Sequence, residues 1–202
     1  MPQSGFVQQS NVTESQLQGH NPPISRLQQI AALYVRKHFM PTSITAQNGR
    51  QFSCFPAAIL VIVVNDLNEV LLFSKKPSEW IVVSGAIEEG ETILESAIRE
   101  LKEEAGEGLR VLPVGVVHAH TFQYDEIAKN MISIHYVVRY QGGEISPGDD
   151  MAGAIYAWWS LLKIQTSIHE IVIPKNQYWI FERAINLISN FEDQEASLEY
   201  DI

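Results

Sequence analysis

The chain has 202 residues, of which 46% are hydrophobic, so it holds enough apolar material for one globular domain with extensions. Its net charge of −10 excludes the clustered basic surface that nucleic acid phosphates require, and its single cysteine, Cys54, excludes an intramolecular disulfide. The chain opens without a basic, apolar signal segment, and its longest apolar stretch, residues 55–64, is too short to span a bilayer. We therefore expect a cytoplasmic protein without nucleic acid or membrane partners.

The first part of the chain is expected to carry an arm and a helix. Residues 1–22 are rich in Gln, Ser and Asn, which is typical of a disordered arm. Ser25 and Gln28 form a capping box, and apolar residues then recur at helical spacing up to Pro41. We therefore predict a helix over 23–40, which either covers the core or pairs with a second copy of the chain in a homodimer.

Strand-like runs fill the next segment. The predicted strands are residues 44–46, 50–54, 57–64 and 70–74. Gln47-Asn48-Gly49 separates the first two, and Asn-Gly between such runs predicts a hairpin. The third is continuously apolar, which indicates a strand buried on both faces, and Asn65-Asp66 supplies the turn to the fourth.

A helix is predicted over residues 92–105. Thr92 and Glu95 form a capping box, and Gly106 supplies the C-terminal stop. Apolar residues recur along one stripe of this helix and are expected to face the core.

Three carboxylates accompany this stripe on the adjoining helical face. Glu100, Glu103 and Glu104 are related by i, i+3 and i+4, so their side chains can converge on one volume. Like charges at this spacing repel each other, and such a group either stays in water or gathers hard cations that take oxygen ligands. Arg99 points away from the stripe, and we expect it to reach back to Glu91 at the helix entrance.

The charged positions form a longer pattern that begins before the helix, G-x5-E-x7-R-E-U-x-E-E-x-G. Its fixed positions are Gly85, Glu91, Arg99, Glu100, Leu101, Glu103, Glu104 and Gly106. This run closely resembles the Nudix box. The resemblance implies an α/β fold, a Nudix-type α/β/α sandwich with a mixed β-sheet over residues 41–190, together with the N-terminal helical extension.

The chain departs from the family pattern at two places. Val83-Ser84 stands at the entrance, where the family often has Pro-Gly before the glycine that opens the box. Glu107 stands after the last glycine, where the family usually has an aliphatic residue, and we expect Leu109 to pack in its place.

The remaining elements follow the box. Residues 111–123 and 131–140 alternate as paired strands, and residues 154–159 are typical of a further strand. Pro174 precedes an apolar pattern that predicts a closing helix. Residues 191–202 are read as an acidic, frayed tail.

The resemblance implies a chemistry. Nudix enzymes typically hydrolyse a nucleoside diphosphate linked to another moiety, such as an NDP-sugar or a dinucleoside polyphosphate, by attack of water on phosphorus. The implied cofactor is Mg²⁺, with Mn²⁺ as the alternative ion, and the implied partner is a small nucleotide substrate. By resemblance, Glu100, Glu103, Glu104 and the carbonyl of Gly85 are metal ligands. Glu91 and Arg99 complete the catalytic set as orienting residues.

The group that activates the water is left open. Within the box the candidates are Glu100 and Glu103. The candidates in loops are Asp125, Glu126, Glu144, Asp149 and Asp150. Each loop acid alone is more often a solvated turn residue, and Gly148-Asp149-Asp150 is the sequence to test first.

The histidines and tryptophans offer cleft residues. His118 and His120 share a strand face, with His135 opposite, and we interpret them as polar positions lining a cleft rather than as a zinc site. Trp158 and Trp159 are expected to be one buried and one half-exposed. Phe122 and Tyr124 lie where some dinucleoside-polyphosphate and ADP-sugar hydrolases carry subgroup residues. Neither the proline-centred ADP-ribose signature nor the coenzyme A signature is present.

Three functions compete. The first is a Nudix pyrophosphohydrolase, because the box glutamates and the arginine are all present. The second is a non-catalytic nucleotide-binding or regulatory Nudix-fold module, which is supported only by the altered entrance at Ser84 and by Glu107 after the last glycine. The third, an isoprenoid-diphosphate isomerase, needs a reactive cysteine, and the complete hydrolase box argues against assigning that role to Cys54.

Overall fold

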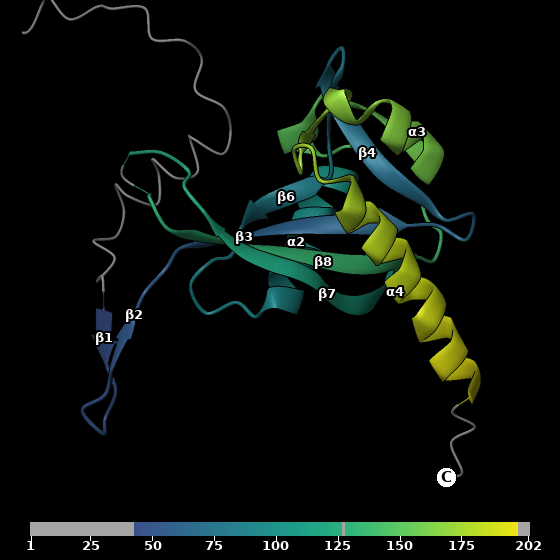
Figure 1. Ribbon diagram of the computed structural model, residues 1–202. Helices are drawn as coiled ribbons and strands as arrows, with labels where there is room; N and C mark the ends of the chain where they lie inside the picture. Colours follow the sequence, from purple (N-terminus) through teal and green to yellow (C-terminus); the bar gives the residue numbers. More distant parts are fainter. Residues whose placement is uncertain (1–42, 127, 198–202) are drawn as a thin grey trace, which may run out of the picture. The chain divides into compact units, whose positions relative to one another are not determined.

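The computed structural model describes residues 43–126 and 128–197 (Figure 1). The predicted arm over 1–22 and the predicted helix over 23–40 lie outside these residues. Within the described residues, no helix is both long and apolar enough to cross a membrane.

The described residues form ten strands and three helices. The strands are β1 (Ser43–Thr45), β2 (Gln51–Ser53), β3 (Ala57–Val64), β4 (Glu69–Lys76), β5 (Glu79–Ile81), β6 (Val83–Ala86), β7 (Val111–Phe122), β8 (Met131–Tyr140), β9 (Ile155–Ser160) and β10 (Ile171–Ile173). The helices are α2 (Ile93–Ala105), α3 (Leu161–Thr166) and α4 (Tyr178–Ser197), with 3₁₀ turns η2 (Asp149–Met151) and η3 (Ile168–Glu170).

The strands form two sheets. The predicted hairpin is present, and β1 and β2 make a two-stranded antiparallel sheet of their own. The other eight strands form a mixed sheet in the order β10-β5-β4-β3-β8-β7, to which β6 adds by pairing with β3 and β9 by pairing with β4. β3 runs parallel to β8 and antiparallel to β6, so the sheet is mixed, as predicted.

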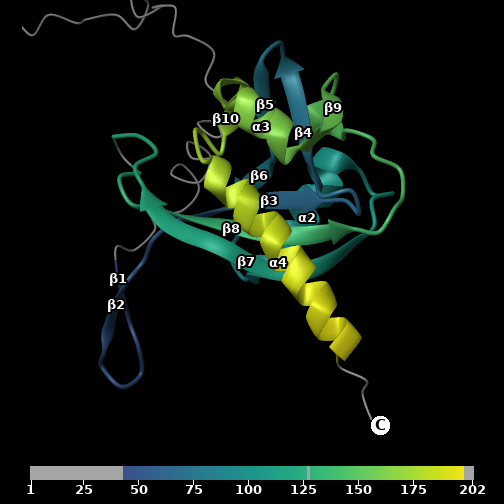
Figure 2. The same cartoon turned by 45° about the vertical axis from the view of Figure 1, so that its right-hand side comes forward.

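Helices cover both faces of this sheet. Alternate residues of β3 point to opposite sides: Leu60 and Ile62 join the core cluster that includes α4 residues, whereas Ile59 and Val61 join the cluster that includes α2 residues. Figures 1 and 2 show α4 crossing one face while α2 lies behind the sheet. Burying such an aliphatic side chain stabilises the fold by roughly 1.5–3 kcal/mol. The α/β/α sandwich is therefore confirmed.

The helix of the predicted box has the predicted ends. Thr92 is the N-cap of α2, and its hydroxyl accepts from the backbone N–H of Glu95 at 3.2 Å, while the Glu95 carboxylate accepts from the backbone N–H of Thr92 at 2.8 Å. Gly106 follows the last turn with a φ of 102°, a backbone conformation that favours glycine.

Other elements differ from the sequence-based expectation. β5, β6, β10 and α3 were not predicted. The three strands have only three or four residues each, too few to show a period. α4 begins at Tyr178 and continues to Ser197, so it extends into the segment that was expected to be a frayed tail.

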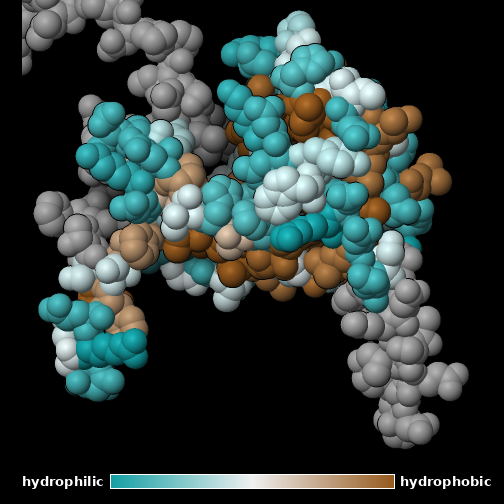
Figure 3. Space-filling view, in the orientation of Figure 1, coloured by the Kyte–Doolittle hydropathy of each residue, from teal (hydrophilic) through white to brown (hydrophobic). Residues whose placement is uncertain are grey.

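Some apolar side chains remain on the surface of the sandwich. Figure 3 shows them gathered over β7 and β8, and Val116 of β7 is exposed. β7 is an end strand of the sheet order, so one of its two edges has no neighbouring strand in the described chain.

Candidate active site

Arg99 organises the entrance of α2. Its Nε donates to Glu91 Oε1 at 2.7 Å, and its second terminal nitrogen (Nη2) donates to Glu91 Oε2 at 3.0 Å and to the carbonyl of Ala86 at 2.8 Å. The other terminal nitrogen (Nη1) donates to Glu100 Oε1 at 2.8 Å and to Glu103 Oε2 at 3.2 Å. The contact predicted between Arg99 and Glu91 is present, and one guanidinium links the loop before the helix to two helical carboxylates.

Glu91 receives further donors at the same carboxylate. The Ser96 hydroxyl donates to Glu91 Oε2 at 2.6 Å and the backbone N–H of Glu88 donates to it at 2.9 Å. The hydrogen bonds from Arg99 contribute most, and together with those from Ser96 and Glu88 they lower the pKa of Glu91 from 4.5 to about 2 against the opposing effect of burial. The same pairing raises the pKa of Arg99. Both groups are therefore charged at neutral pH.

Glu100 lies against the backbone of β6. Its side chain is 4% exposed, and a Cβ added to Gly85 would lie 1.8 Å from Glu100 Oε1. Only a residue without a side chain fits at position 85 while Glu100 keeps this place. Gly85 and Glu100, two fixed positions of the pattern, are therefore in direct contact, and the glycine leaves room for the carboxylate.

Glu104 is the second buried carboxylate. It is 2% exposed, and its Oε2 accepts from the backbone N–H of Ser84 at 3.0 Å. We had expected Glu104 to lie on the acidic face, outside the apolar stripe; instead it is buried between α2 and β6. The reason is that β6, a four-residue strand without a sequence signal, brings its backbone N–H groups to the helix.

Glu103 has a different environment from its two neighbours. Its side chain is 43% exposed and is held by Arg99. Within residues 43–126 and 128–197, no three His, Cys, Asp or Glu side chains surround one point as a finished metal cage. The convergence of Glu100, Glu103 and Glu104 on one volume, predicted from their spacing, is therefore not found as such a group in the described chain. Divalent cations such as Mg²⁺ can be bound through one or two carboxylates together with waters and substrate phosphate. The two buried carboxylates, Glu100 and Glu104, are the donors that such an ion would meet.

An acidic turn packs on the end of α2. The backbone N–H of Ser146 donates to the carbonyl of Ala105 at 2.8 Å, and that of Gly148 donates to the carbonyl of Glu104 at 3.4 Å. These bonds satisfy carbonyls that the last turn of a helix leaves without helical partners. Of the predicted loop acids, Asp149 and Asp150 are thus carried by the turn that contacts α2.

The other loop acids lie in different surroundings. Asp125 accepts from the backbone N–H of Ala128 at 2.7 Å and closes the turn between β7 and β8, where Glu126 is exposed. Glu144 is also exposed and lies beside Gly108. These three acids have the local environments of turn residues.

The sequence profile of the NUDIX domain family matches residues 55–177. The chain belongs to the Nudix family. The match contains the whole box. The geometry joins Gly85 to Glu100 and Arg99 to Glu91 within the box, and Glu104 to Ser84 just before it.

Relatives and solved structures agree with this assignment. An ADP-ribose pyrophosphatase from Methanocaldococcus jannaschii is 27% identical over 128 residues, which span 61% of this chain and 75% of the relative. The crystal structure of a NUDIX family hydrolase from Clostridium perfringens is 22% identical, with a TM-score of 0.50, over 67% of this chain and 97% of that chain. A UDP-X diphosphatase structure is 13% identical, with a TM-score of 0.53, over 79% of this chain and 72% of that chain. The structures share the fold, and the family and the relative support the predicted class, a Nudix pyrophosphohydrolase.

The two departures from the Nudix box have local explanations. Ser84 contributes its backbone N–H to Glu104, so the bond does not depend on which side chain stands there. Glu107 is 81% exposed beside Lys102, and Leu109 packs against the apolar cluster under α2, as predicted. Neither departure disturbs the contacts of the carboxylates.

The three histidines of β7 and β8 lie together on the α4 side of the sheet. His118 and His135 are cross-strand partners with ring centroids 5.4 Å apart, and His120 lies 5.0 Å from His118. His135 is 1% exposed, and its Nε2 lies 3.2 Å from the Ser133 hydroxyl. His135 was expected to line a cleft, but it is buried, and burial lowers its pKa to about 4. Of the tryptophans, Trp159 is buried and Trp158 is half-buried, as predicted.

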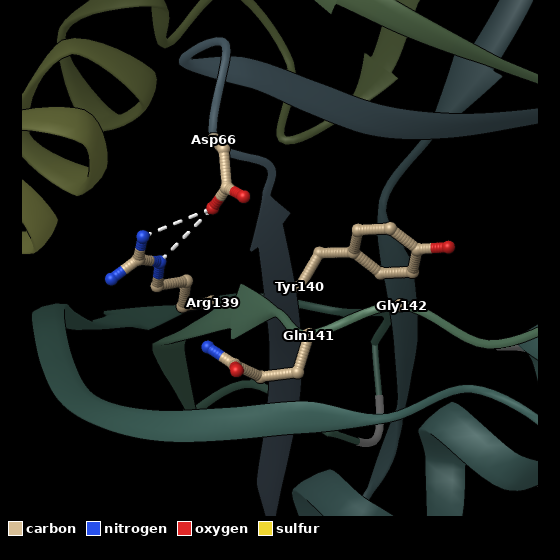
Figure 4. Close-up of a pocket in the computed structure, with 5 residues that line it drawn as sticks. All are labelled: Asp66, Arg139, Tyr140, Gln141 and Gly142. Carbon is tan, nitrogen blue, oxygen red and sulfur yellow. Dashed lines mark hydrogen bonds and ion pairs between the residues drawn. The ribbon is translucent and has the colours of Figure 1, made fainter.

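Two of the hollows on the described surface differ in their relation to the site. One, of about 460 Å³, runs along the outer side of α2 and includes Arg99 and Glu103. The other, of about 350 Å³, lies where the end of β8 meets the turn after β3 (Figure 4). There Arg139 donates to Asp66 Oδ1 at 3.0 and 3.2 Å. None of the box residues lines this second hollow.

Proposed function

We propose that this chain is a divalent-metal-dependent pyrophosphohydrolase that cleaves a nucleoside diphosphate linked to another moiety, with water attacking phosphorus. The observation that carries the proposal is the pair of buried carboxylates, Glu100 and Glu104, held against the backbone of β6. Burying two carboxylates costs free energy unless each is compensated by hydrogen bonds, opposite charge or a cation. A divalent cation would compensate the two buried negative charges, so the site is suited to such an ion.

Each box residue has a proposed role. Glu100 and Glu104 would hold the ion, with Glu103 and the carbonyl of Gly85 as the further ligands that the family resemblance implies. Arg99 and Glu91 fix the loop before α2 and orient Glu100. A bound Mg²⁺ or Mn²⁺ would supply positive charge to the diphosphate oxygens as the bond breaks. Because the chain is acidic overall, a diphosphate substrate is expected to arrive together with its cation.

The activation of water is assigned to the carboxylates near the end of α2. Glu103 is exposed enough to reach a solvent molecule, and Asp150 is carried by the turn that packs on the same end of the helix. Either group would take the proton of the attacking water as a general base. Arg99 donates to both glutamates, but the Glu100 side chain is only 4% exposed whereas that of Glu103 is 43% exposed, so Glu100 is less suited to this role.

An ADP-linked diphosphate is the first substrate to test, because the relative from Methanocaldococcus jannaschii is named an ADP-ribose pyrophosphatase. The chain lacks the proline-centred ADP-ribose signature, so other substrates belong in the same experiment. The test is a screen for phosphate-ester release from ADP-ribose, NDP-sugars, dinucleoside polyphosphates, NADH, coenzyme A and nucleoside triphosphates with Mg²⁺ or Mn²⁺. Turnover of one class that stops with a chelator supports the proposal. Binding without turnover across the panel would instead favour the regulatory Nudix-fold module.

A further inference from the structure

The turn formed by residues 148–151, the acidic turn, lies in an electrostatically unfavourable place. It carries the exposed Asp150 to the C-terminal end of α2, where the helix dipole is negative and Glu103 and Glu104 add their charges. Such an arrangement is destabilising unless other contacts hold it. Locally unfavourable arrangements of this kind are expected mainly at functional or strained sites.

Two anchors hold the ends of the acidic turn. At one end, a Cβ added to Gly148 would lie 2.0 Å from the carbonyl oxygen of Glu103, so the turn contacts the helix backbone directly. At the other end, Met151 is 2% exposed within the apolar cluster under α2. The backbone N–H of Met151 donates to the carbonyl of Gly148 at 2.8 Å and closes the turn.

A lysine from a distant strand reaches the residue between these anchors. Lys75 lies near the end of β4, where the pairing with β5 shifts register, and two residues after Phe73, which is buried in the same apolar cluster as Met151. Its Nζ donates to the backbone carbonyl of Asp150. This bond joins two elements that are 75 positions apart in sequence and places an ammonium group beside the turn that carries the two acids.

We propose that Lys75 is a positioning residue that holds the acidic turn against the end of α2 and thereby sets the place of Asp150 at the reaction centre. The proposal rests on the proposed function for its consequence, because the position of the turn matters for turnover only if the carboxylates act in hydrolysis. Lys75 itself touches the backbone of the turn, so its effect should appear in turnover more than in substrate binding.

The chain supplies a matched control. Lys76 is the next residue, its side chain is 72% exposed, and its Nζ pairs with Glu79 of β5 at 3.4 Å. Lys75→Met removes the donor, Lys75→Arg keeps one, and Lys76→Met removes an equal charge without touching the turn. The full-length chain is used for all three variants.

The test has a readout that needs no substrate. Amide hydrogen exchange at Gly148 and Met151 reports opening of the acidic turn, and Lys75→Met should raise it by about fivefold while Lys75→Arg and Lys76→Met leave it near the wild-type value. On the substrate found by the screen, Lys75→Met should lower kcat by a similar factor with KM little changed, and Lys75→Arg should restore it. Unchanged exchange in Lys75→Met overturns the proposal whether or not the chain hydrolyses anything. Raised exchange with unchanged kcat also overturns it, because the lysine would then be merely structural. Raised exchange in a chain without any turnover would count against the proposed function and not against the docking of the turn.

Discussion

Gly85 and Glu100 lie in direct contact, with the glycine Cα facing the glutamate carboxylate so closely that no side chain fits between them. Glu100 has little freedom to withdraw, because it is buried and Arg99 donates to its Oε1 at 2.8 Å. The position of a proposed metal ligand is therefore fixed by a residue that has no side chain.

Gly85→Ala should displace the Glu100 carboxylate. We expect hydrolysis to fall by about 100-fold and the free energy of unfolding to fall by about 1–3 kcal/mol, the usual range for overpacking. A double-mutant cycle with Glu100→Gln measures the coupling. If Gly85 acts through Glu100, the double variant is little worse than either single variant, whereas additive losses would show that the two residues act separately.

Arg99→Lys should loosen the entrance of α2. A lysine cannot reproduce the forked contacts to Glu91 and Ala86 together with those to Glu100, so we expect a loss of about 1.5–3 kcal/mol in the free energy of unfolding. Chemical denaturation measures this loss. Arg50→Lys, in the exposed β1–β2 hairpin, is the control and should change stability by less than about 0.5 kcal/mol. Equal stability of the two variants would contradict the organising role of Arg99.

The depressed pKa of Glu91 predicts a dependence of stability on acid. Because the pKa falls from 4.5 to about 2 on folding, the carboxylate stabilises the fold above pH 4.5, and this contribution is lost as the pH falls from 4.5 towards 2. Glu91→Gln should therefore flatten the fall of the melting temperature over this window. The exposed Glu79→Gln variant should keep the wild-type profile. Parallel profiles for wild type and Glu91→Gln would contradict the pairing with Arg99.

The lowered pKa of His135 predicts a second pH range in which the stability of the fold decreases as the pH falls. Its pKa falls from 6.5 to about 4 on folding, so the unfolded chain binds a proton that the folded chain refuses between these values, and stability decreases as the pH falls through them. His135→Phe should remove this pH-dependent loss in the free energy of unfolding, which amounts to at most about 3 kcal/mol across the range. Exposed His169 offers the control variant, His169→Gln. A slope unchanged in His135→Phe would mean that His135 takes up its proton in the folded state.

Much of the site could be predicted from sequence, because helical spacing is regular. Thr92, Glu95 and Gly106 set the ends of α2, and the fixed spacing of Glu91 and Arg99 indicated their contact before the structure showed it. The burial of Glu104 could not be predicted, since it depends on β6, which is too short to show a period. The docking of Lys75 on the acidic turn was equally hidden, because the two segments are brought together only by the pairing of β4 and β9.

The central claim is that the buried carboxylates support metal-dependent hydrolysis, and Glu104→Gln tests it most directly. Initial rates are measured with and without Mg²⁺ on the substrate identified by the screen, for wild type, Glu104→Gln and the exposed control Glu107→Gln. Thermal unfolding of each variant checks that the fold persists. We predict Mg²⁺-dependent turnover for wild type and Glu107→Gln, and a rate lower by about 100-fold or more for folded Glu104→Gln. A wild-type rate in Glu104→Gln, or wild-type turnover that continues without any divalent ion, would contradict the claim.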